Sequence, residues 1–439
     1  MLTLDALSPD GEYRPQRRET VADVVDLAVV PRLFITRTVA AQRKAAPLPL
    51  SERPRALARA AEVFAGETIA GLSYPEYVEL TRRISGLPAA VALAGAGVVA
   101  ESLATAFEAV RAALPAGATL DWREQPGGAV WARCGEVLAV HAPGNAPGVH
   151  GLWPQALALG YRVAVRPSRR EPLTAHRVIT ALRRAGFRDT DATYLPTDYA
   201  RADDLVRVAD RALVYGGQDV ADRYAGDPSV FVNGPGRTKI LITADRHWPD
   251  HLDVIVDSVA ALGGMACVNA TAVLVEGSHD TAAGLARAIA TGLADVAALP
   301  TMPIARAHAV AAHLATRAAG ATPILGADQV VADLGDGFAA LRPAVHLLAA
   351  PSGEIDVELP FPCVWVAPWS RGDGVAPLRN SLLVNAITSD GALLDRLVHE
   401  PTISGVYSGR VATHHGAPHI PHDGFLADFL MRNKGFVVS

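Results

Sequence analysis

Short apolar runs alternate with amphipathic ones after residue 137, and this alternation constrains the fold more than any other feature of the sequence. Strands that alternate with helices of about three turns predict a parallel sheet with helices on both faces. In the first alternating region the expected strands are 137–141, 161–165, 192–195 and 211–214, and the expected helices are 153–159, 173–185 and 201–209. A second region, from residue 252 onward, predicts helices at 252–262, 280–294 and 304–319 and strands at 272–275, 344–348 and 364–367.

The segments outside these regions predict helices and a small β element. Residues 51–64 and 89–113 have apolar side chains at helical spacing, so the first third of the chain is expected to be mostly helical. Residues 120–123 and 129–132 flank Gly127-Gly128, which predicts a hairpin. The chain closes on an apolar stretch, Phe436–Val438, which suits pairing at a sheet edge. We expect the hairpin and this tail to join subunits of a homodimer or homotetramer.

Composition narrows the class of protein. Forty Lys and Arg against 45 Asp and Glu give a net charge of −5, which does not suit a general nucleic-acid binder. The three cysteines, Cys134, Cys267 and Cys363, are odd in number and far apart, so a reducing compartment is expected rather than a disulfide framework. The N-terminus lacks the pattern of a secretory signal, and the apolar run 87–100 is short for a membrane span. We therefore expect a cytoplasmic protein that binds neither nucleic acid nor membrane.

Two segments carry side chains suited to acyl chemistry. Cys267 follows a glycine pair in Gly263-Gly-Met-Ala-Cys-Val-Asn269, where the thiol is either a nucleophile or a buried structural side chain. Asn145 lies in the proline- and glycine-rich turn His141-Ala-Pro-Gly-Asn-Ala-Pro-Gly-Val-His150. Its amide either donates to a developing oxyanion or satisfies the backbone of the turn.

Two further segments lie where nucleotides bind in α/β proteins. Arg166 and Ser168 follow an expected strand, at the carboxyl edge of the sheet. Gly216 and Gly217 stand between an expected strand and a helix, where backbone N–H groups can hold a pyrophosphate. A glycine pair of this kind is also common in ordinary turns.

Taken in order and spacing, these segments resemble the aldehyde dehydrogenase superfamily over roughly residues 50 to 430. The first part is similar to its oxyanion-asparagine and lysine-proline-serine motifs, in Pro143-Gly-Asn-Ala-Pro147, Trp153-Pro-Gln-Ala-Leu-Ala-Leu-Gly160, Val165-Arg-Pro-Ser168, Pro172-Leu-Thr-Ala175 and Ala185-Gly186. The later part is similar to its phenylalanine-threonine-glycine-serine turn, its cysteine motif and its glutamate-isoleucine-phenylalanine-glycine-proline segment, in Val214–Val220, Gly264–Val275 and Glu358-Leu-Pro-Phe-Pro362.

The resemblance implies an α/β fold with two Rossmann-like parallel-sheet domains and a small β oligomerisation element. It implies a nicotinamide-binding domain at 1–118 and 138–250, a catalytic domain at 251–415, and the oligomerisation hairpin and tail at 119–137 and 416–439. Cys267 would be the nucleophile, and Asn145 would form the oxyanion hole with the Cys267 backbone N–H. The positions that would contact the cofactor are Arg166, Ser168, Gly216, Gly217 and Glu358.

One departure from the family pattern bears on the reaction. Aldehyde-oxidising members use a glutamate to activate the water that hydrolyses the cysteine thioester. The matching segment here is Phe231-Val-Asn-Gly-Pro-Gly-Arg237, which puts Asn233 (or Val232, if the register shifts) at that position, and no Glu occurs between Glu171 and Glu276. We therefore expect reduction of an acyl thioester, carried by CoA or by an acyl carrier protein, to an aldehyde. Aldehyde oxidation with another base, such as His247 or His251, and a catalytically silent homologue that serves as a binding partner are the alternatives.

The residues after Ser168 bear on the choice of nicotinamide. Arg169 and Arg170 stand where NAD-preferring members have an acidic side chain, and a guanidinium can pair with a 2′-phosphate. This predicts a preference for NADPH, with NADH also possible. A second basic cluster, Arg14, Arg17 and Arg18, either meets a CoA phosphate or an acidic carrier protein or, as we expect, is a solvated tail before the fold begins. The histidines at 414, 415, 419 and 422 do not have the spacing of a metal site, so no metal is expected.

Overall fold

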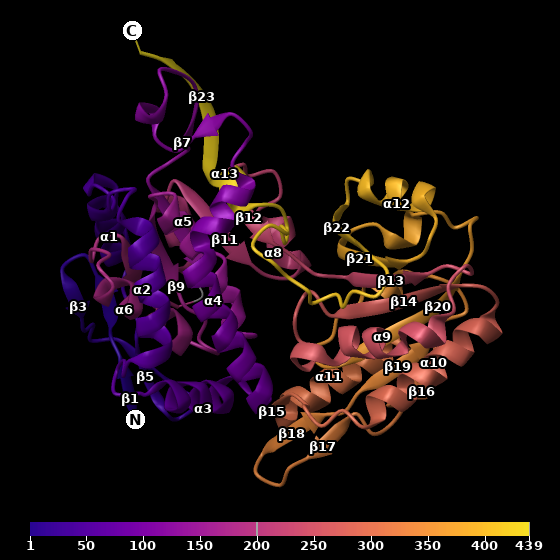
Figure 1. Ribbon diagram of the computed structural model, residues 1–439. Helices are drawn as coiled ribbons and strands as arrows, with labels where there is room; N and C mark the ends of the chain where they lie inside the picture. Colours follow the sequence, from indigo (N-terminus) through magenta and orange to yellow (C-terminus); the bar gives the residue numbers. More distant parts are fainter. Residues whose placement is uncertain (199–200, 439) are drawn as a thin grey trace. The chain divides into compact units, whose positions relative to one another are not determined.

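The computed structural model describes residues 1–198 and 201–438, which divide into two compact units (Figure 1). The first unit comprises residues 1–85, 92–234 and 418–439, of which Ser439 lies outside the described residues, and the second comprises residues 86–91 and 235–417. The long middle segment of the first unit ends at residue 234, and the second unit continues from residue 235. This boundary comes earlier in the chain than the expected one at 250. The reason is that β13 (Thr238–Ile242) pairs with strands of the second unit.

A seven-stranded sheet organises the first unit. Its order is β12-β11-β8-β9-β10-β2-β3, and the five strands from β12 to β10 are parallel. The bounds are β2 Ala6–Ser8, β3 Gly11–Tyr13, β8 Val137–His141, β9 Arg162–Arg166, β10 Ala192–Tyr194, β11 Arg211–Tyr215 and β12 Val230–Asn233. The strands expected at 137–141, 161–165, 192–195 and 211–214 are thus confirmed to within a residue. They end in register, since His141 lies opposite both Arg166 and Val214, and Tyr215 lies opposite Asn233.

Helices follow the expected apolar spacing in this unit. They are α1 Arg32–Lys44, α2 Arg53–Gly66, α3 Tyr74–Ser85, α4 Ala89–Ala113, α5 Pro154–Ala158, α6 Leu173–Arg184, α7 Ala202–Val208, α8 Gln218–Arg223 and α13 Leu426–Leu430. By length and composition α4 is able to cross a bilayer, although 39% of its most apolar window is buried inside the protein. The helix expected at 89–113 is confirmed with the same bounds.

The N-terminus forms strands, so the expectation of a solvated basic tail before the fold is wrong, whereas the helices expected in the rest of the first third are present as α2 and α4. Strands β1 (Leu2–Leu4), β4 (Arg18–Val21) and β5 (Val25–Ala28) form a sheet in the order β1-β5-β4. Arg18 bonds Asp5 and Asp26 at 2.5 Å each, and Arg14 bonds Asp5 at 2.9 Å. Acidic partners that are distant in the sequence therefore hold this basic cluster within the fold.

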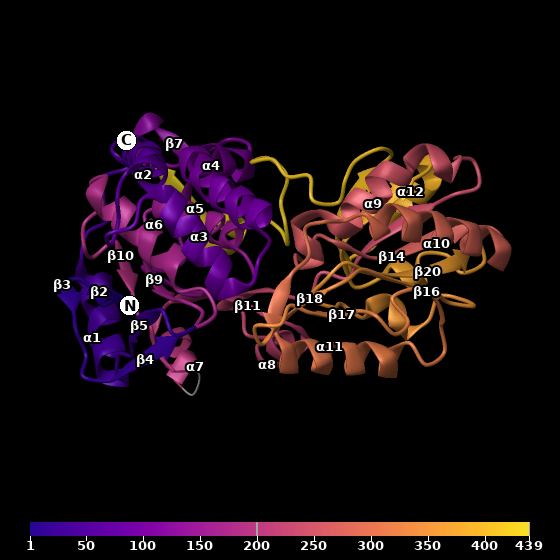
Figure 2. The same ribbon diagram turned by 90° about the horizontal axis from the view of Figure 1, so that it is seen from below.

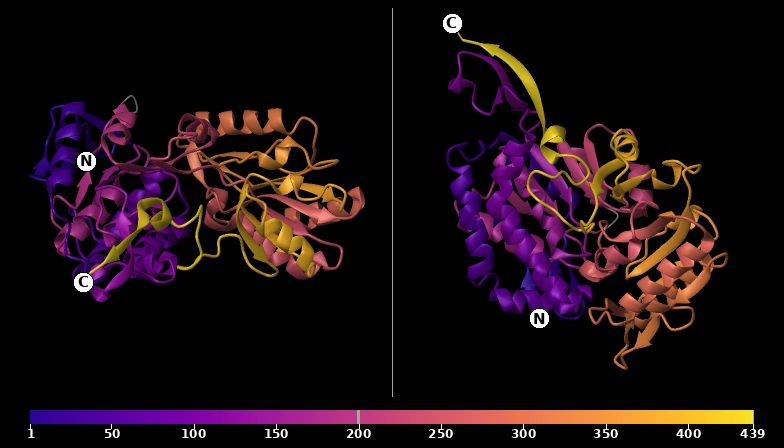
Figure 3. Two further views of the ribbon diagram at one scale, coloured as in Figure 1. Left: turned by 90° about the horizontal axis from the view of Figure 1, so that it is seen from above. Right: turned by 45° about the vertical axis from the view of Figure 1, so that its right-hand side comes forward.

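The expected hairpin near residue 120 is also different in the structure. Strand β6 (Ala118–Thr119) runs parallel to β7 (Gly127–Arg133), and residues 122–124 form a short 3-10 helix. The antiparallel partner of β7 is the C-terminal strand β23 (Met431–Val437), which begins earlier than expected. Figures 1 and 3 show β7 and β23 extending away from the helices of their unit. Local sequence did not reveal this pairing because it joins segments three hundred residues apart.

The second unit contains the second parallel sheet, in the order β16-β19-β20-β14-β13-β21-β22, with only the edge strand β16 antiparallel. Besides β13, its strands are β14 Ala270–Glu276, β16 Thr322–Leu325, β19 Ala344–Leu347, β20 Cys363–Trp369, β21 Ser381–Ile387 and β22 Ile403–Ser408. Strands β15 Thr301–Pro303, β17 Val331–Asp333 and β18 Phe338–Leu341 form a separate small sheet. The helices are α9 Leu252–Ala260, α10 His279–Ala294, α11 Ile304–Arg317 and α12 Gly391–Val398.

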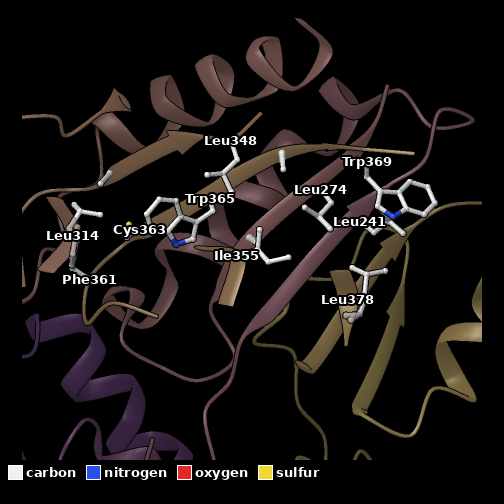
Figure 4. Close-up of a cluster of buried hydrophobic side chains, with 14 of the residues drawn as sticks. Leu241, Leu274, Leu314, Leu348, Ile355, Phe361, Cys363, Trp365, Trp369 and Leu378 are labelled. Carbon is white, nitrogen blue, oxygen red and sulfur yellow. The ribbon is translucent and has the colours of Figure 1, made fainter. Parts of the chain in front are cut away.

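Two apolar clusters cover this sheet. Figure 2 shows α10 and α11 on opposite faces. One cluster joins α9 and α10 to the sheet, and the other joins α11 and α12 to it. The second cluster includes Trp365, Trp369, Phe361 and Cys363 (Figure 4). Packed strands of this kind give a rigid base for the loops at their ends.

Candidate active site

The first set of expected site residues lies at the carboxyl edge of the first sheet. Asn145 follows β8. Arg166 is the last residue of β9 and Ser168 follows it, and Gly216 and Gly217 follow β11. Since these strands are parallel neighbours that end in register, the loops after them emerge at one edge. The structure thus brings this set together, as the sequence predicted.

Two of these loops are packed against each other. A Cβ atom at Gly144 would lie 2.3 Å from Ser168 Oγ, so only glycine allows the turn before Asn145 to approach the loop after β9. Ser168 Oγ accepts a hydrogen bond from the Arg170 backbone N–H at 3.1 Å. The loop that carries Asn145 and the loop that carries Ser168 therefore support one another.

Buried polar groups along this edge lack partners. Among the residues that the structure describes, no group bonds Asn145 Oδ1, His141 Nε2 or Asn233 Oδ1. The side-chain oxygen Oδ1 of Asn145 therefore accepts no hydrogen bond from the backbone of its own turn. Burial, aided by the Arg166 guanidinium, lowers the pKa of His141 to about 4. The edge offers a fixed cation, a hydroxyl and unpaired amide oxygens, which fits the polar parts of a dinucleotide.

The glycine pair after β11 has a packing role of its own. Helix α8 has only six residues, and Gly217 is its N-cap. A Cβ atom at Gly216 would lie 2.3 Å from Val220 Cγ2, so this glycine is needed for the strand to turn into the helix. The turn supplies backbone N–H groups at the edge, and its glycines are explained by packing as well as by a ligand.

The second set lies in the second unit, around Cys267. The segment runs from a 3-10 turn at Ala261–Gly264 to β14, and Leu262, Gly263 and Gly264 have φ of 55°, 70° and 66°. A Cβ atom at Gly264 would lie 2.3 Å from Pro362 N, so the glycine lets the loop rest on the 361–362 backbone. Cys267 is half-buried, whereas Cys363 is in the apolar core, where burial raises the pKa of its thiol. Cys267 is thus partly exposed and lies outside the apolar core that contains Cys363.

Side chains near Cys267 fix its backbone. Thr238 Oγ1 donates to the Cys267 carbonyl at 2.8 Å. Asn269 Oδ1 accepts from the Ala266 N–H at 2.9 Å, while Asn269 Nδ2 donates to the carbonyls of Ser258 and Ala261 at 3.2 and 2.7 Å. The cysteine therefore stands on a loop whose shape is determined by buried hydrogen bonds.

Glu358 lies beside the same loop. Its two carboxylate oxygens accept from the Gly236 N–H at 3.0 and 3.1 Å, and a Cβ atom at Gly236 would lie 1.9 Å from the Cys267 carbonyl oxygen. Part of the Glu358 residue is exposed, but its carboxyl group is turned to the backbone. Desolvation raises the pKa of Glu358, and the N–H groups of Gly236 and Arg237 oppose that rise. The structure thus joins Cys267 and Glu358 through Gly236.

Sequence reasoning missed a buried cation that supports Glu358. Lys239 is 0% exposed on β13, its Nζ lies 2.8 Å from Asp356, and it donates to Ser381 Oγ at 2.8 Å. The pair fixes the chain two residues before Glu358. Burial lowers the pKa of Lys239, and Asp356 opposes this shift. A lysine inside the apolar strand Thr-Lys-Ile-Leu-Ile was the available signal.

The histidines at 414, 415, 419 and 422 are not placed to form a metal centre. Within residues 1–198 and 201–438, no cluster of three or more His, Cys, Asp or Glu side chains is placed to hold a metal ion. His414 lies 3.6 Å from Asp257, and His422 lies 3.1 Å from Asp423. His414 and His422 therefore each lie beside a different carboxylate.

Comparison with known proteins shows the fold. The chain matches γ-glutamyl-γ-aminobutyraldehyde dehydrogenase of Burkholderia cenocepacia (TM-score 0.83, 16% identity, 99% of this chain and 96% of that one). It also matches an indole-3-acetaldehyde dehydrogenase of P. syringae, solved with NAD+ (0.82, 16%, 98% and 96%), and an NADP-dependent enzyme of E. coli (0.79, 14%, 99% and 98%). No protein-family model and no curated protein matches the sequence. The chain therefore has the aldehyde dehydrogenase fold, with two Rossmann-like parallel sheets, as expected.

Proposed function

We propose that the chain is an NADPH-dependent acyl-thioester reductase that carries the acyl group on Cys267. The observation behind this proposal is Asn233 at the end of β12, where a hydrolytic glutamate is expected, in a stretch without Glu from 172 to 275. An amide cannot take a proton from water at neutral pH. A cysteine thioester without that base is protected from hydrolysis and is suited to reduction.

The residues would act in two steps. The Cys267 thiolate attacks the carbonyl of the thioester, and the CoA or carrier thiol leaves with a proton. Asn145 and the Cys267 backbone N–H donate to the oxyanion that forms. When bound, the reduced nicotinamide supplies the hydride that makes the acyl carbon a hemithioacetal. Its collapse releases the aldehyde and restores the thiolate, so water is not consumed.

The cofactor residues at the first edge are Arg166, Ser168, Gly216 and Gly217, with Glu358 in the second unit. The preference for NADPH rests on Arg169. Losing one charge-assisted hydrogen bond to a phosphate costs about 1.5–3 kcal/mol, so NADPH should be favoured roughly 10–150-fold in kcat/KM. Arg169→Glu should remove or invert that preference, and equal efficiency with NADH in the unmodified enzyme would contradict it.

A second candidate is NAD(P)-dependent oxidation of an aldehyde to an acid. It is favoured by the names of two of the matching structures, the indole-3-acetaldehyde and γ-glutamyl-γ-aminobutyraldehyde dehydrogenases. It needs a base other than Asn233. Of the two histidines considered, His247 is largely exposed and lies 3.2 Å from Asp250, and His251 is partly buried.

One experiment separates the two candidates. Purified protein is given acyl-CoA and acyl-phosphopantetheine thioesters of several chain lengths with NADPH, and aldehyde and free thiol are measured. We expect equal amounts of each, and no product from Cys267→Ala. No NADPH consumption with thioesters, together with free acid from aldehyde and NAD(P)+, would refute the reductase and support oxidation.

If the protein catalyses neither reaction, the remaining alternative is a catalytically silent homologue that serves as a binding partner. Failure of Cys267 to react with iodoacetamide would favour that alternative.

We also propose a cytoplasmic homodimer or homotetramer that pairs through β7 and β23. Val437 at the end of β23 is 88% exposed in the isolated chain, as a subunit-pairing strand would be. Light scattering that gives 46.0 kDa at micromolar concentration would contradict this assembly.

A further inference from the structure

The Arg169 side chain, three residues beyond β9, has an acidic partner from the N-terminal strands. Arg169 Nε lies 2.8 Å from Glu19 Oε2. Glu19 belongs to β4, and its other oxygen, Oε1, lies 3.8 Å from the Arg17 guanidinium. One carboxylate is thus shared between two guanidinium groups from distant parts of the chain.

This arrangement contains two guanidinium groups, Arg17 and Arg169, and two carboxylates, Glu19 and Asp198. Guanidinium groups pair with carboxylates and phosphates in the same geometry, so a carboxylate between two of them takes the place of an anionic ligand. Arg17 also bonds Asp198 at 2.6 Å, which keeps it at this position. The side chain of Arg169 is 52% exposed and that of Glu19 is 20% exposed, so the contact is open to solvent on the arginine side.

The place of the pair in the fold indicates the kind of anion. Arg169 follows β9 at the carboxyl edge, where a dinucleotide binds in sheets of this type. Adenine nucleotides that carry a phosphomonoester on the ribose bring a dianion to such an edge. The 2′-phosphate of NADPH and the 3′-phosphate of CoA share this chemistry.

The proposed function already assigns Arg169 to a ribose phosphomonoester of an adenine nucleotide; we propose that Arg17 completes this phosphate seat and that Glu19 is a built-in competitor for it. The inference rests on the proposed function, because it assumes that a nucleotide binds at this edge. Glu19 then sets how strongly the protein selects the phosphorylated ribose. An exposed ion pair is weak, so a dianionic phosphate is able to displace the carboxylate.

Removing the competitor gives a direct test. Isothermal titration calorimetry measures adenosine 2′,5′-bisphosphate, adenosine 3′,5′-bisphosphate and 5′-AMP against wild type, Glu19→Gln and Glu19→Gln/Arg169→Gln. The matched control is Glu67→Gln, which removes a carboxylate of the same unit that pairs with Arg59 and Arg184 instead. Calorimetry needs no turnover, so its result is independent of the reaction catalysed.

We expect Glu19→Gln to tighten one bisphosphate about 5-fold or more, to leave 5′-AMP within 2-fold, and to lose this gain in the double variant. The bisphosphate that responds, 2′ or 3′, identifies NADPH or CoA as the source of the phosphate. An equal gain for 5′-AMP, an equal gain in Glu67→Gln, or no gain at all would overturn the proposal. No binding of any of the three nucleotides to wild type or Glu19→Gln would overturn it as well.

The result also stands apart from the thioester reaction. If thioesters are reduced while Glu19→Gln changes no affinity, this inference fails and the proposed function stands. If the bisphosphate responds as expected but thioesters are not reduced, the proposed function fails and the phosphate seat remains.

Discussion

Gly236→Ala is the substitution that most directly tests how Cys267, the proposed nucleophile, is positioned. Gly236 lies against the Cys267 peptide and donates its N–H to Glu358. An added Cβ atom would lie 1.9 Å from the Cys267 carbonyl oxygen, 2.5 Å from its carbon and 2.6 Å from its Cα. All three contacts are with backbone, so no side chain can rotate away to make room.

The size of the effect follows from these contacts. Cβ atoms essentially never approach another heavy atom closer than 3.0 Å, so the Cys267 peptide or the Gly236 peptide has to move by about 1 Å. Thr238 Oγ1 restrains the first peptide and Glu358 restrains the second. A displacement of about 1 Å in a group that positions a reacting atom costs about 10²-fold in rate. We therefore expect kcat for thioester reduction to fall about 100-fold.

Gly234→Ala is the matched control, because a Cβ atom there would have only Ala221 Cβ nearby, at 4.0 Å. Both variants are assayed for NADPH consumption with the best acyl thioester, for the rate of Cys267 alkylation by iodoacetamide, and for Tm. Gly234→Ala should stay within about 2-fold of wild type in both rates. Equal kcat in the two variants, with both folded, would refute the account of Gly236 as a contact that positions Cys267.

Three further predictions concern the nucleophile, the oxyanion donor and acid stability. Cys267→Ala should abolish turnover, and a variant that keeps a tenth of the rate would exclude the acyl-enzyme. Asn145→Ala should lower kcat about 10²–10³-fold where chemistry limits the rate, and an unchanged kcat would place it outside the site. Burial lowers the pKa of His150 to about 3 and that of His176 to about 4, so the unfolded chain takes up their protons near pH 6.5 while the folded chain does not. The free energy of unfolding is unaffected by these two histidines above pH 6.5 and falls with decreasing pH until about pH 4 for His176 and about pH 3 for His150. Between pH 6 and pH 5 the two together should lower the free energy of unfolding, measured in urea, by about 2–3 kcal/mol, and His176→Asn should remove about half of that pH dependence.

Local sequence determined the strands and helices that carry the first set of site residues. Strands β8, β9 and β11 are continuous apolar runs between turn residues, and such runs need no distant information to be recognised. Their parallel order follows from the helices between them, so the common edge that carries Asn145 and Arg166 was predictable before any coordinates.

Segments whose partners are distant in sequence were beyond that reasoning. Strands of three or four residues, such as β1 and β4, have too few positions for a period and exist because other strands pair with them. The pairing of β7 with β23 and the boundary at residue 234 are of the same kind. Each depends on which edge of a sheet is available, and the sequence does not state this.

At the site, the sequence determined which groups are present, and the tertiary structure decided which of them are already engaged. The order and types of residues sufficed to name Cys267, Glu358 and Arg169. That Glu358 is bonded to the Gly236 N–H, and that Arg169 is paired with Glu19, follows only from folding. The physical reason is that a charged side chain is satisfied by whichever opposite charge or N–H group the fold brings within about 3 Å, at any separation along the chain.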